Sequence, residues 1–253
     1  MYDPIDMKSL FSLRVEKGVV VSDLHLFAMR SRGEILFRSL AGWLKEVDYL
    51  VFNGDIFDFR WSRIGNHEAT SAAAAAWLNG VLNANPNCRV RYVLGNHDCV
   101  PEFERALDEL SANNKRFRWH EYWMRLGNAL FLHGDCAQGI FDPAALDRYR
   151  EGWRGNRKRG GFSNPAYIFV DRLGLSFLVH RWHFPPAKSS ARVAYYLDRA
   201  LPEWRNEVTD CYFGHTHVPF SGYSVGGIRF HNTGSAIPTL GFNPLGFEVQ
   251  AAH

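Results

Sequence analysis

The chain has 253 residues, a hydrophobic fraction of 46% and a net charge of +3 with its histidines neutral. This length fits one domain, and the apolar fraction is sufficient for a large core. The small net charge argues against the broad basic surface of a nucleic-acid channel, and no uninterrupted apolar run is long enough to span a membrane.

The N-terminal residues and the cysteines indicate the compartment. Residues 1–6 lack the basic start and the apolar stretch of a secretory signal. The four cysteines are scattered, and no pair has the spacing of a zinc site. Cys99 and Cys136 are interpreted as small apolar side chains that fill space in the core. We therefore expect a cytoplasmic protein without structural disulfides.

Five short apolar runs are each followed closely by a polar cluster. The runs lie at residues 19–21, 49–52, 90–94, 129–132 and 211–213. They are rich in β-branched and aromatic residues and are bounded by Gly or Asn, which predicts buried strands. A sixth strand is expected at residues 228–232.

Helical patterns separate the first of these runs. An apolar stripe between the first two strands consists of Leu36, Leu40, Leu44 and Val47. A second helix is expected over residues 71–82, with Ser71 as its N-cap, and a third begins at Pro101. Strands that alternate with helices predict a layered α/β fold.

The polar clusters contain side chains that bind divalent cations. The candidate metal ligands are Asp23, His25, Asp55, Asn96, His133, His215 and His217. Two metal ions at close range need a bridging carboxylate, and neutral imidazole and amide ligands complete each shell without excess negative charge. This mixture of nitrogen and oxygen ligands suits Mn, Fe or Zn better than Mg or Ca. We expect two divalent metal ions, with Mn as the first choice and Fe or Zn as alternatives.

The spacing within the clusters adds geometric information. Residues i and i+2 of a strand point to the same face, so Asp23 and His25, and likewise His215 and His217, can converge on one metal or straddle two. A glycine precedes Asp55, Asn96 and His215, which permits a close approach of backbone and ligands. All ligands follow strands, at the edge where open α/β sheets place their sites.

In these five clusters the chain resembles the calcineurin-like metallophosphoesterases, from about residue 19 to residue 235. The resemblance implies a β-sandwich flanked by helices. It implies a first metal held by Asp23, His25, Asp55 and His217. It implies a second metal held by Asp55, Asn96, His133 and His215, with Asp55 bridging the two ions.

The same resemblance implies catalytic roles beside the metals. His97 would stand next to the scissile phosphate, and Asp98 would orient His97. An imidazole at that place can protonate or stabilise the leaving oxygen. Asp58 and Asp135 are interpreted as groups that fix the orientation of the ligands.

Residues 136–210 interrupt the scaffold, and we expect them to form a helical lid inserted into a single domain of residues 1–253. The segment contains twelve Lys and Arg against eight Asp and Glu, so it carries +4 while the rest of the chain carries about −1. Helices are expected over residues 165–181 and 189–201, the latter ended by Pro202. Candidate substrate-binding cations are Arg157, Lys188 and Arg192.

Three interpretations of this insertion stay open. It could only pack its apolar face on the scaffold. It could be a lid whose cations bind a charged phosphate substrate while its apolar face shelters a lipid. It could also bind the inner face of a membrane peripherally, because basic amphipathic helices bind anionic headgroups.

Within the superfamily, the chain is most similar to the UDP-diacylglucosamine pyrophosphohydrolases of lipid A synthesis. The shared motifs are residues 22–26, residues 133–135 and residues 214–217, separated by a helical segment. Two departures are His97, where that subfamily has Arg, and Val218, where it has Arg before the proline. We expect a hydrolase of phosphodiester or pyrophosphate bonds in a nucleotide- or lipid-linked substrate. The alternatives are a nuclease of the same superfamily and a non-catalytic metal-binding scaffold.

Overall fold

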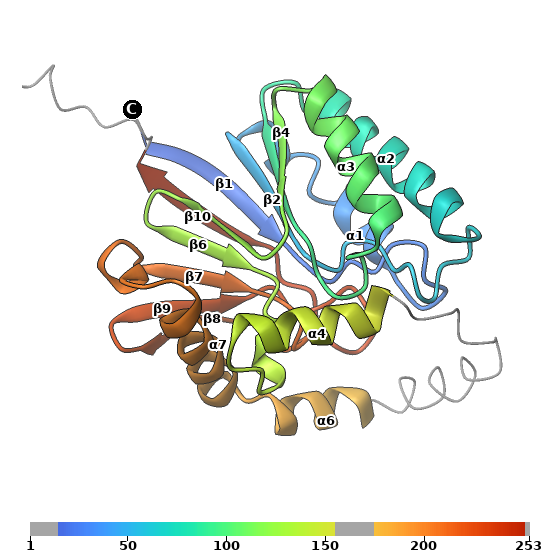
Figure 1. Ribbon diagram of the computed structural model, residues 1–253. Coiled ribbons are helices and arrows are strands. Elements are labelled where there is room, and N and C mark those ends of the chain that lie inside the picture. The colour runs from blue at the N-terminus through green and yellow to red at the C-terminus, as the bar shows by residue number, and fades with distance from the viewer. Residues whose placement is uncertain (1–14, 155–174, 251–253) are drawn as a thin grey trace, which may run out of the picture.

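The computed structural model describes residues 15–154 and 175–250. Two five-stranded sheets pack face to face, and helices cover their outer faces (Figure 1). The layered α/β fold expected from the sequence is confirmed. Within the described ranges, no helix is both long and apolar enough to cross a bilayer.

The first sheet has the strand order β10-β1-β2-β3-β4. β1 to β4 run parallel, and β10 pairs antiparallel with β1. The strands are β1 (Val15–Val21), β2 (Tyr49–Asn53), β3 (Arg89–Val93), β4 (Phe117–His120) and β10 (Leu245–Gln250). β2 is buried throughout because one of its faces meets helices and the other meets the second sheet.

The second sheet has the strand order β5-β6-β7-β9-β8. β6, β7 and β9 run parallel, and the edge strands β5 and β8 are antiparallel to their neighbours. The strands are β5 (Trp123–Leu126), β6 (Ala129–Leu132), β7 (Asp210–Phe213), β8 (Phe220–Val225) and β9 (Ile228–Asn232). Val51, Phe131 and Phe247 belong to the apolar layer between the two sheets.

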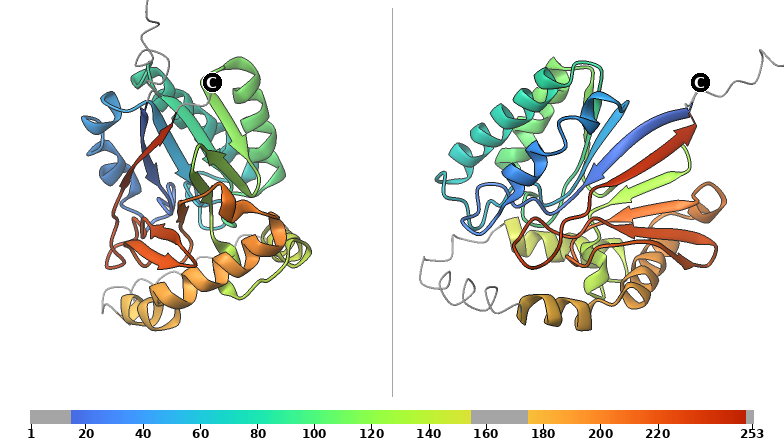
Figure 2. Two further views of the ribbon diagram at one scale, coloured as in Figure 1. Left: turned by 90° about the vertical axis from the view of Figure 1, so that its left-hand side faces the viewer. Right: turned by 180° about the vertical axis from the view of Figure 1, so that it is seen from behind.

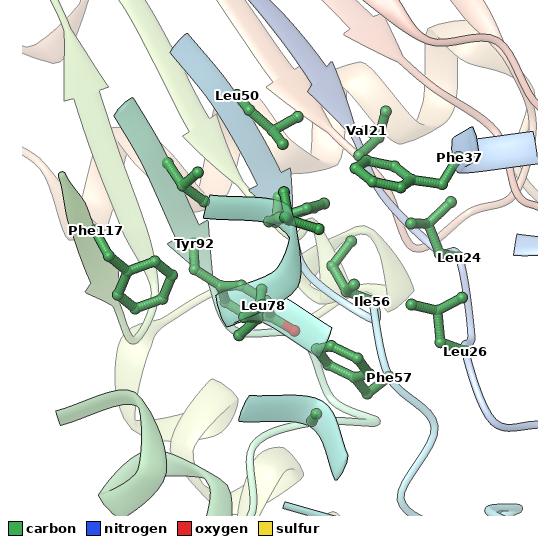
Figure 3. Close-up of a cluster of buried hydrophobic side chains, with 14 of the residues drawn as sticks. Val21, Leu24, Leu26, Phe37, Leu50, Ile56, Phe57, Leu78, Tyr92 and Phe117 are labelled. Carbon is green, nitrogen blue, oxygen red and sulfur yellow. The ribbon is translucent and has the colours of Figure 1, made fainter. Parts of the chain in front are cut away.

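Three helices cover the first sheet: α1 (Gly33–Arg38), α2 (His67–Ala84) and α3 (Pro101–Asn113). α2 and α3 lie side by side on its outer face (Figure 1). Figure 3 shows Phe57, Leu78 and Tyr92 within the apolar cluster between these helices and the strands. This cluster holds the carboxyl ends of β1, β2 and β3 in place.

The helix expected from the apolar stripe between the first two strands is shorter than predicted. α1 ends at Arg38, tight turns follow, and a 3₁₀ helix, η1, covers Trp43–Lys45. The Ser39 hydroxyl donates to the Leu36 carbonyl at 2.6 Å, which competes with regular helix bonding. Leu40 and Leu44 are still buried, so the stripe correctly marked the packed face.

The predicted cap of the second helix is wrong. α2 begins four residues before Ser71, and Ser71 lies buried inside it. Asn66 is the cap: its backbone is extended, and its side chain accepts from the Ala69 N–H at 2.9 Å. The start of α3 at Pro101 is confirmed.

The connection from β6 to β7 contains η2 (Asp135–Gln138), α4 (Pro143–Arg154), α6 (Leu175–His183) and α7 (Pro186–Ala200), followed by the short η4 (Trp204–Asn206). α7 lies on the outer face of the second sheet (Figure 2), where Val193 and Leu197 pack with Leu130 and Phe213. The last part of the predicted insertion is therefore part of the scaffold core. α7 starts at Pro186, three residues before the predicted start.

The helix expected over residues 165–181 is described only in part, and a further helix, α4, was not predicted. Residues 165–174 of the expected first helix lie outside the described residues, and α6 covers the remainder to His183. α4 was not predicted, because Leu146 is its only buried apolar residue and Arg150 occupies the other buried position. That the segment works as a lid stays a prediction.

Candidate metal centre

The structure brings all seven predicted ligands to one place. They follow β1, β2, β3, β6 and β7, whose carboxyl ends meet at one end of the sandwich. Backbone hydrogen bonds join the loops: the Asp23 N–H donates to the Gly54 carbonyl, and the His25 N–H donates to the Asp55 carbonyl, each at 3.0 Å. The Gly214 N–H donates to the His133 carbonyl at 2.7 Å, which joins the second sheet to the same centre.

Five of these ligands have a left-handed backbone. Asp23, His25, Asp55, His215 and His217 have φ between 47° and 62°. Such φ values are uncommon outside glycine and cost free energy. Only three of the other described non-glycine residues have positive φ. The strained conformations are therefore concentrated where side chains must turn toward one point.

The glycines before the ligands provide space for them. A Cβ atom on Gly54 would collide with the imidazole of His133. On Gly95 it would collide with the carboxylate of Asp55, and on Gly214 with that of Asp23. Each glycine thus permits a ligand from a different loop to approach the backbone. The close approach expected from the sequence is confirmed at all three positions.

Gly95→Ala should weaken metal binding, because the added methyl group displaces the Asp55 carboxylate. We expect a loss of roughly 10- to 100-fold in affinity, as when a group that orients a ligand is removed. Isothermal titration with Mn²⁺ measures it. Gly80→Ala is the matched control, since a Cβ at this helical position meets nothing within 4 Å. It should leave affinity unchanged and stabilise α2 by about 0.5–1 kcal/mol. Equal affinities for both variants and the wild type would contradict the prediction.

One group of ligands comprises Asp23, His25 and His217, whose ligand atoms lie within 4.8 Å of one another. His217 Nε2 lies 3.1 Å from Asp23 Oδ1 and 3.3 Å from His25 Nε2. The Asp23 carboxylate also accepts the His215 N–H at 3.0 Å. Three side chains from two loops thus face one point, as a metal site requires.

A second group comprises Asp55, His133 and His215. His133 Nε2 lies 3.3 Å from Asp55 Oδ2 and 3.2 Å from His215 Nδ1. Asn96 joins this group, because its Oδ1 lies 2.9 Å from His215 Nδ1. Asp55 also forms a third group, with His25 and His97. Its carboxylate therefore lies between the two halves of the centre, where the resemblance places the bridging ligand.

Several buried polar atoms of the centre lack a protein partner. His25 Nδ1 and His217 Nδ1 are buried and make no hydrogen bond to any residue of the described ranges. The facing nitrogens of His25 and His217, and those of His133 and His215, are separated by only 3.2–3.3 Å. Paired imidazole nitrogens next to buried carboxylates fit divalent cations, which supply the positive charge that such a cluster needs.

The electrostatics of His215 and His217 agree with this fit, whereas His133 is protonated unless a cation takes the place of its proton. Burial lowers the pKa of His215 to about 3, with a further contribution from the charge on His133. Burial likewise lowers the pKa of His217 to about 4. Both imidazoles are therefore neutral at pH 7, the form that binds metals. Burial opposes protonation of His133, but the Asp55 and Asp23 carboxylates outweigh it and raise the pKa of His133 to about 10.

The partner expected for His97 was wrong. Asp98 Oδ2 accepts from the Tyr92 hydroxyl at 2.6 Å and its Oδ1 from the Gly95 N–H at 2.7 Å, so this carboxylate holds the loop. His97 Nδ1 instead lies 3.3 Å from Asp58 Oδ1. The backbone directs the Asp98 side chain into the core. Asp58 lies in the loop that follows β2, beside the loop after β3 that carries His97. The carboxylate beside His97 is Asp58, and Asp58 Oδ2 also lies 3.6 Å from His25 Nδ1.

Asp135 forms a buried ion pair with Arg150 of α4. Arg150 Nε donates to Asp135 Oδ2 at 2.8 Å, and both side chains are almost fully buried. Arg150 Nη2 also donates to the Leu94 carbonyl at 3.0 Å, immediately before the Gly95–Asn96–His97 loop. Burial raises the pKa of Asp135, but the positive charge of Arg150 outweighs this effect and holds the pKa below the ordinary value. Arg150 thus connects α4 to two ligand loops.

Of the three predicted substrate-binding cations, the structure describes Lys188 and Arg192, and neither is shown at the metal ligands. Arg157 lies outside the described residues. Lys188 is exposed in the first turn of α7. Arg192 donates to the Ala137 carbonyl of η2 at 2.8 Å, so it supports the segment that follows His133. Their role in substrate binding stays a prediction.

Three side chains of the β6–β7 connection contact the centre and were not singled out in the sequence. Gln138 Nε2 lies 3.0 Å from His215 Nε2. The His180 ring stacks on His217 with centroids 5.1 Å apart, and its Nδ1 lies 3.1 Å from the Thr216 carbonyl. The Trp153 ring lies 4.6 Å from that of His97. No local motif marks these residues, because only the path of the connection brings them here.

A family model matches the part of the chain that carries these ligands. The family model described as calcineurin-like phosphoesterase matches residues 17–219. No curated protein sequence matches the chain significantly. Among solved structures, the chain is similar to Yfce, a phosphoesterase from E. coli, with 17% identity, 88% of this chain and 81% of that chain covered, and a TM-score of 0.39.

Two further solved structures are similar to the chain. For a phosphopantetheinyl hydrolase (PptH) from Mycobacterium tuberculosis, identity is 13%, coverage is 87% of this chain and 90% of that chain, and the TM-score is 0.40. For a dimetal phosphatase from Danio rerio, identity is 11%, coverage is 92% of both chains, and the TM-score is 0.44. The family match spans most of the chain and includes all five ligand clusters. The chain therefore belongs to the calcineurin-like phosphoesterase family and is a metal-dependent hydrolase of phosphoric esters.

Proposed function

We propose that the protein hydrolyses phosphodiester or pyrophosphate bonds with two divalent metal ions, Mn²⁺ being the first choice and Fe or Zn the alternatives. The observation that carries the proposal is the position of Asp55. Its carboxylate belongs both to the group with His133 and His215 and to the group with His25 and His97. A carboxylate placed between two sets of imidazole and oxygen ligands is what a two-metal centre requires.

Each residue of the centre has a proposed role in binding a metal ion or in moving a proton. Asp23, His25, Asp55 and His217 hold one cation, and Asp55, Asn96, His133 and His215 hold the other. Cations held by these residues would supply Lewis-acid chemistry: acidification of a water molecule and stabilisation of the negative charge on the phosphoryl oxygens. His97 stands at the edge of this centre, with Nδ1 toward Asp58. Its other nitrogen can donate a proton to the leaving oxygen.

A lipid-linked nucleotide, similar to UDP-diacylglucosamine, is the substrate class that we propose. α6 reaches the centre through His180, and the same helix exposes Leu178, Val179 and Trp182. Exposed apolar side chains beside a phosphoesterase centre offer a surface to an acyl chain. The excess positive charge of residues 136–210 supports binding of a substrate with more than one phosphate.

The partners and the location follow as proposals from this substrate class. The small or lipid-linked phosphorylated substrate is the partner we propose, and nucleic acid is not. Contact of the lid with the inner face of a membrane would give the protein access to a lipid. A cytoplasmic location and such peripheral association stay predictions.

The first test is Mn²⁺-dependent hydrolysis of bis(p-nitrophenyl) phosphate, a diester, and p-nitrophenyl phosphate, a monoester. We expect the wild type to cleave the diester faster than the monoester, and a chelator to abolish cleavage. His97→Ala should slow a diester with an alkoxide leaving group roughly 10²- to 10⁴-fold, the usual contribution of a general acid. It should slow bis(p-nitrophenyl) phosphate less, because p-nitrophenolate leaves without a proton. His67→Ala is the matched control, since His67 lies on α2 and contacts Glu102 instead. Cleavage that persists in chelator would refute the metal mechanism.

A second experiment separates the substrate classes. UDP-linked lipid and single-stranded DNA are offered to the Mn²⁺-loaded protein in parallel. Cleavage of the lipid pyrophosphate alone supports the proposal, whereas cleavage of DNA with strong salt dependence supports the nuclease alternative. A protein that binds no Mn²⁺ at millimolar concentrations would support the scaffold alternative.

A further inference from the structure

Trp153, in the last turn of α4, lies directly beside His97. Their ring centroids are 4.6 Å apart at an interplanar angle of 43°. On another side, the His25 ring meets His97 edge-on, with centroids 4.8 Å apart. The imidazole of His97 is thus enclosed by one metal ligand and one indole.

Hydrogen bonds alone do not fix the orientation of the His97 ring. The contact of His97 Nδ1 with Asp58 is 3.3 Å long, and among residues 15–154 and 175–250 this buried nitrogen has no partner in regular hydrogen-bond geometry. The strong bond of this residue is made by its backbone, whose N–H donates to Asp55 Oδ1 at 2.8 Å. A backbone bond holds the Cα position but leaves both side-chain torsions open. The plane of the ring therefore depends on packing.

Trp153 itself is held firmly. The guanidinium of Arg60 lies 4.6 Å from the centre of the indole ring, a cation–π contact. Three residues earlier, Arg150 fixes α4 to Asp135 and to the Leu94 carbonyl. In the next position, Arg154 donates to the Cys99 carbonyl at 3.2 Å. Trp153 thus lies between Arg150 and Arg154 on one helical turn, and both arginines fix the position of α4. The indole therefore offers a fixed packing surface to the neighbouring imidazole ring.

We propose that Trp153 is a positioning residue: its indole holds the His97 imidazole at the angle at which it faces the leaving group of the substrate. The proposal rests on the role of His97 in the proposed function. A group displaced by about 1 Å can cost roughly 10²-fold in rate. α4, whose sequence contains no motif of the family, then belongs to the catalytic architecture.

The kinetic test compares esters with good and poor leaving groups. A p-nitrophenyl diester needs little help from an acid, whereas a dialkyl diester, whose leaving group is an alkoxide, needs more. We expect Trp153→Ala to slow the poor leaving group about 10- to 100-fold and the good one much less. Trp153→Phe should retain most of the activity. Trp43→Ala is the matched control, because Trp43 is 38% exposed and lies on η1, which contributes no residue to the centre.

A double-mutant cycle decides whether the effect acts through His97. If Trp153 only positions His97, then Trp153→Ala should cost nothing further in a His97→Ala background. Losses that add fully, or that are equal for both leaving groups, would overturn the proposal.

A spectroscopic readout needs no activity. In the full chain treated with a chelator, the indole ring current should displace the His97 ring-proton resonances, assigned by their loss in His97→Ala. The displacement should shrink in Trp153→Phe and disappear in Trp153→Ala, and unchanged resonances would overturn the proposal. If Trp153→Ala does not fold, Trp153→Phe decides. If the wild type cleaves no ester, the proposed function fails while this measurement still reports on the position of His97.

Discussion

Asp55→Asn should abolish metal-dependent hydrolysis, with a loss of roughly 10³-fold or more, since it removes a charge that both halves of the centre share. Asparagine keeps the acceptor for the His97 N–H, which Asp55 Oδ1 binds at 2.8 Å, so the loop can retain its shape. Asn96→Ala should have a similar effect, because it removes the amide oxygen beside His215. Initial rates with Mn²⁺ and metal content by mass spectrometry measure both variants.

Asp198→Asn is the control for these two variants. Asp198 pairs with Arg205 at the surface, and its pKa is lowered mainly by the hydrogen bond from that guanidinium, not by any metal ligand. It should leave rate and metal content unchanged. Wild-type activity in both Asp55→Asn and Asn96→Ala would refute the mechanism. If Asp55→Asn loses activity while both metal ions stay bound, then Asp55 contributes more to the hydrolysis step than to metal affinity.

Arg150→Met should destabilise the protein by about 3–5 kcal/mol, because it leaves the buried Asp135 carboxylate without a cation. It also removes the donor to the Leu94 carbonyl. In a chain of this size, such a loss corresponds to a decrease in Tm of roughly 10 °C. Urea unfolding followed by circular dichroism measures it. This is the largest stability effect that we expect from a single charged side chain.

The second substitution Asp135→Asn should restore part of the lost stability in the Arg150→Met background, because it removes the uncompensated charge. Arg205→Met is the control, since the exposed Arg205–Asp198 pair should contribute at most about 1 kcal/mol. An Arg150→Met protein as stable as the wild type, or a double variant less stable than both single variants, would show that the buried pair does not support the fold.

The ligand clusters could be recognised in the sequence because each is local. A run of apolar residues, a glycine and a polar side chain lie within a few positions, and this short-range order follows from strand geometry and glycine stereochemistry. Residues 129–132 and 228–232 were predicted with the bounds that β6 and β9 have. β8 was missed because it is an edge strand without a buried side chain, so it carries no alternating apolar pattern.

The partners of the site residues could not be predicted in the same way. Asp98 is next to His97 in the chain, yet the backbone directs it to Tyr92 and Gly95, and Asp58 takes the place beside the imidazole. Nearness in sequence says little about side-chain direction in a turn. The assignment of Asp98 therefore failed, although both residues belong to the motifs.

The sequence by itself determined the α/β class, the five strands that precede the ligands and the seven candidate ligands, because hydrophobic periodicity and strand-to-turn patterns are properties of short segments. The tertiary structure alone decided that Asp58 faces His97, that Arg150 is buried against Asp135, and that Trp153 and His180 border the centre. These contacts join segments far apart in the chain. They depend on how two sheets and three helices of a long connection pack, which no local pattern encodes.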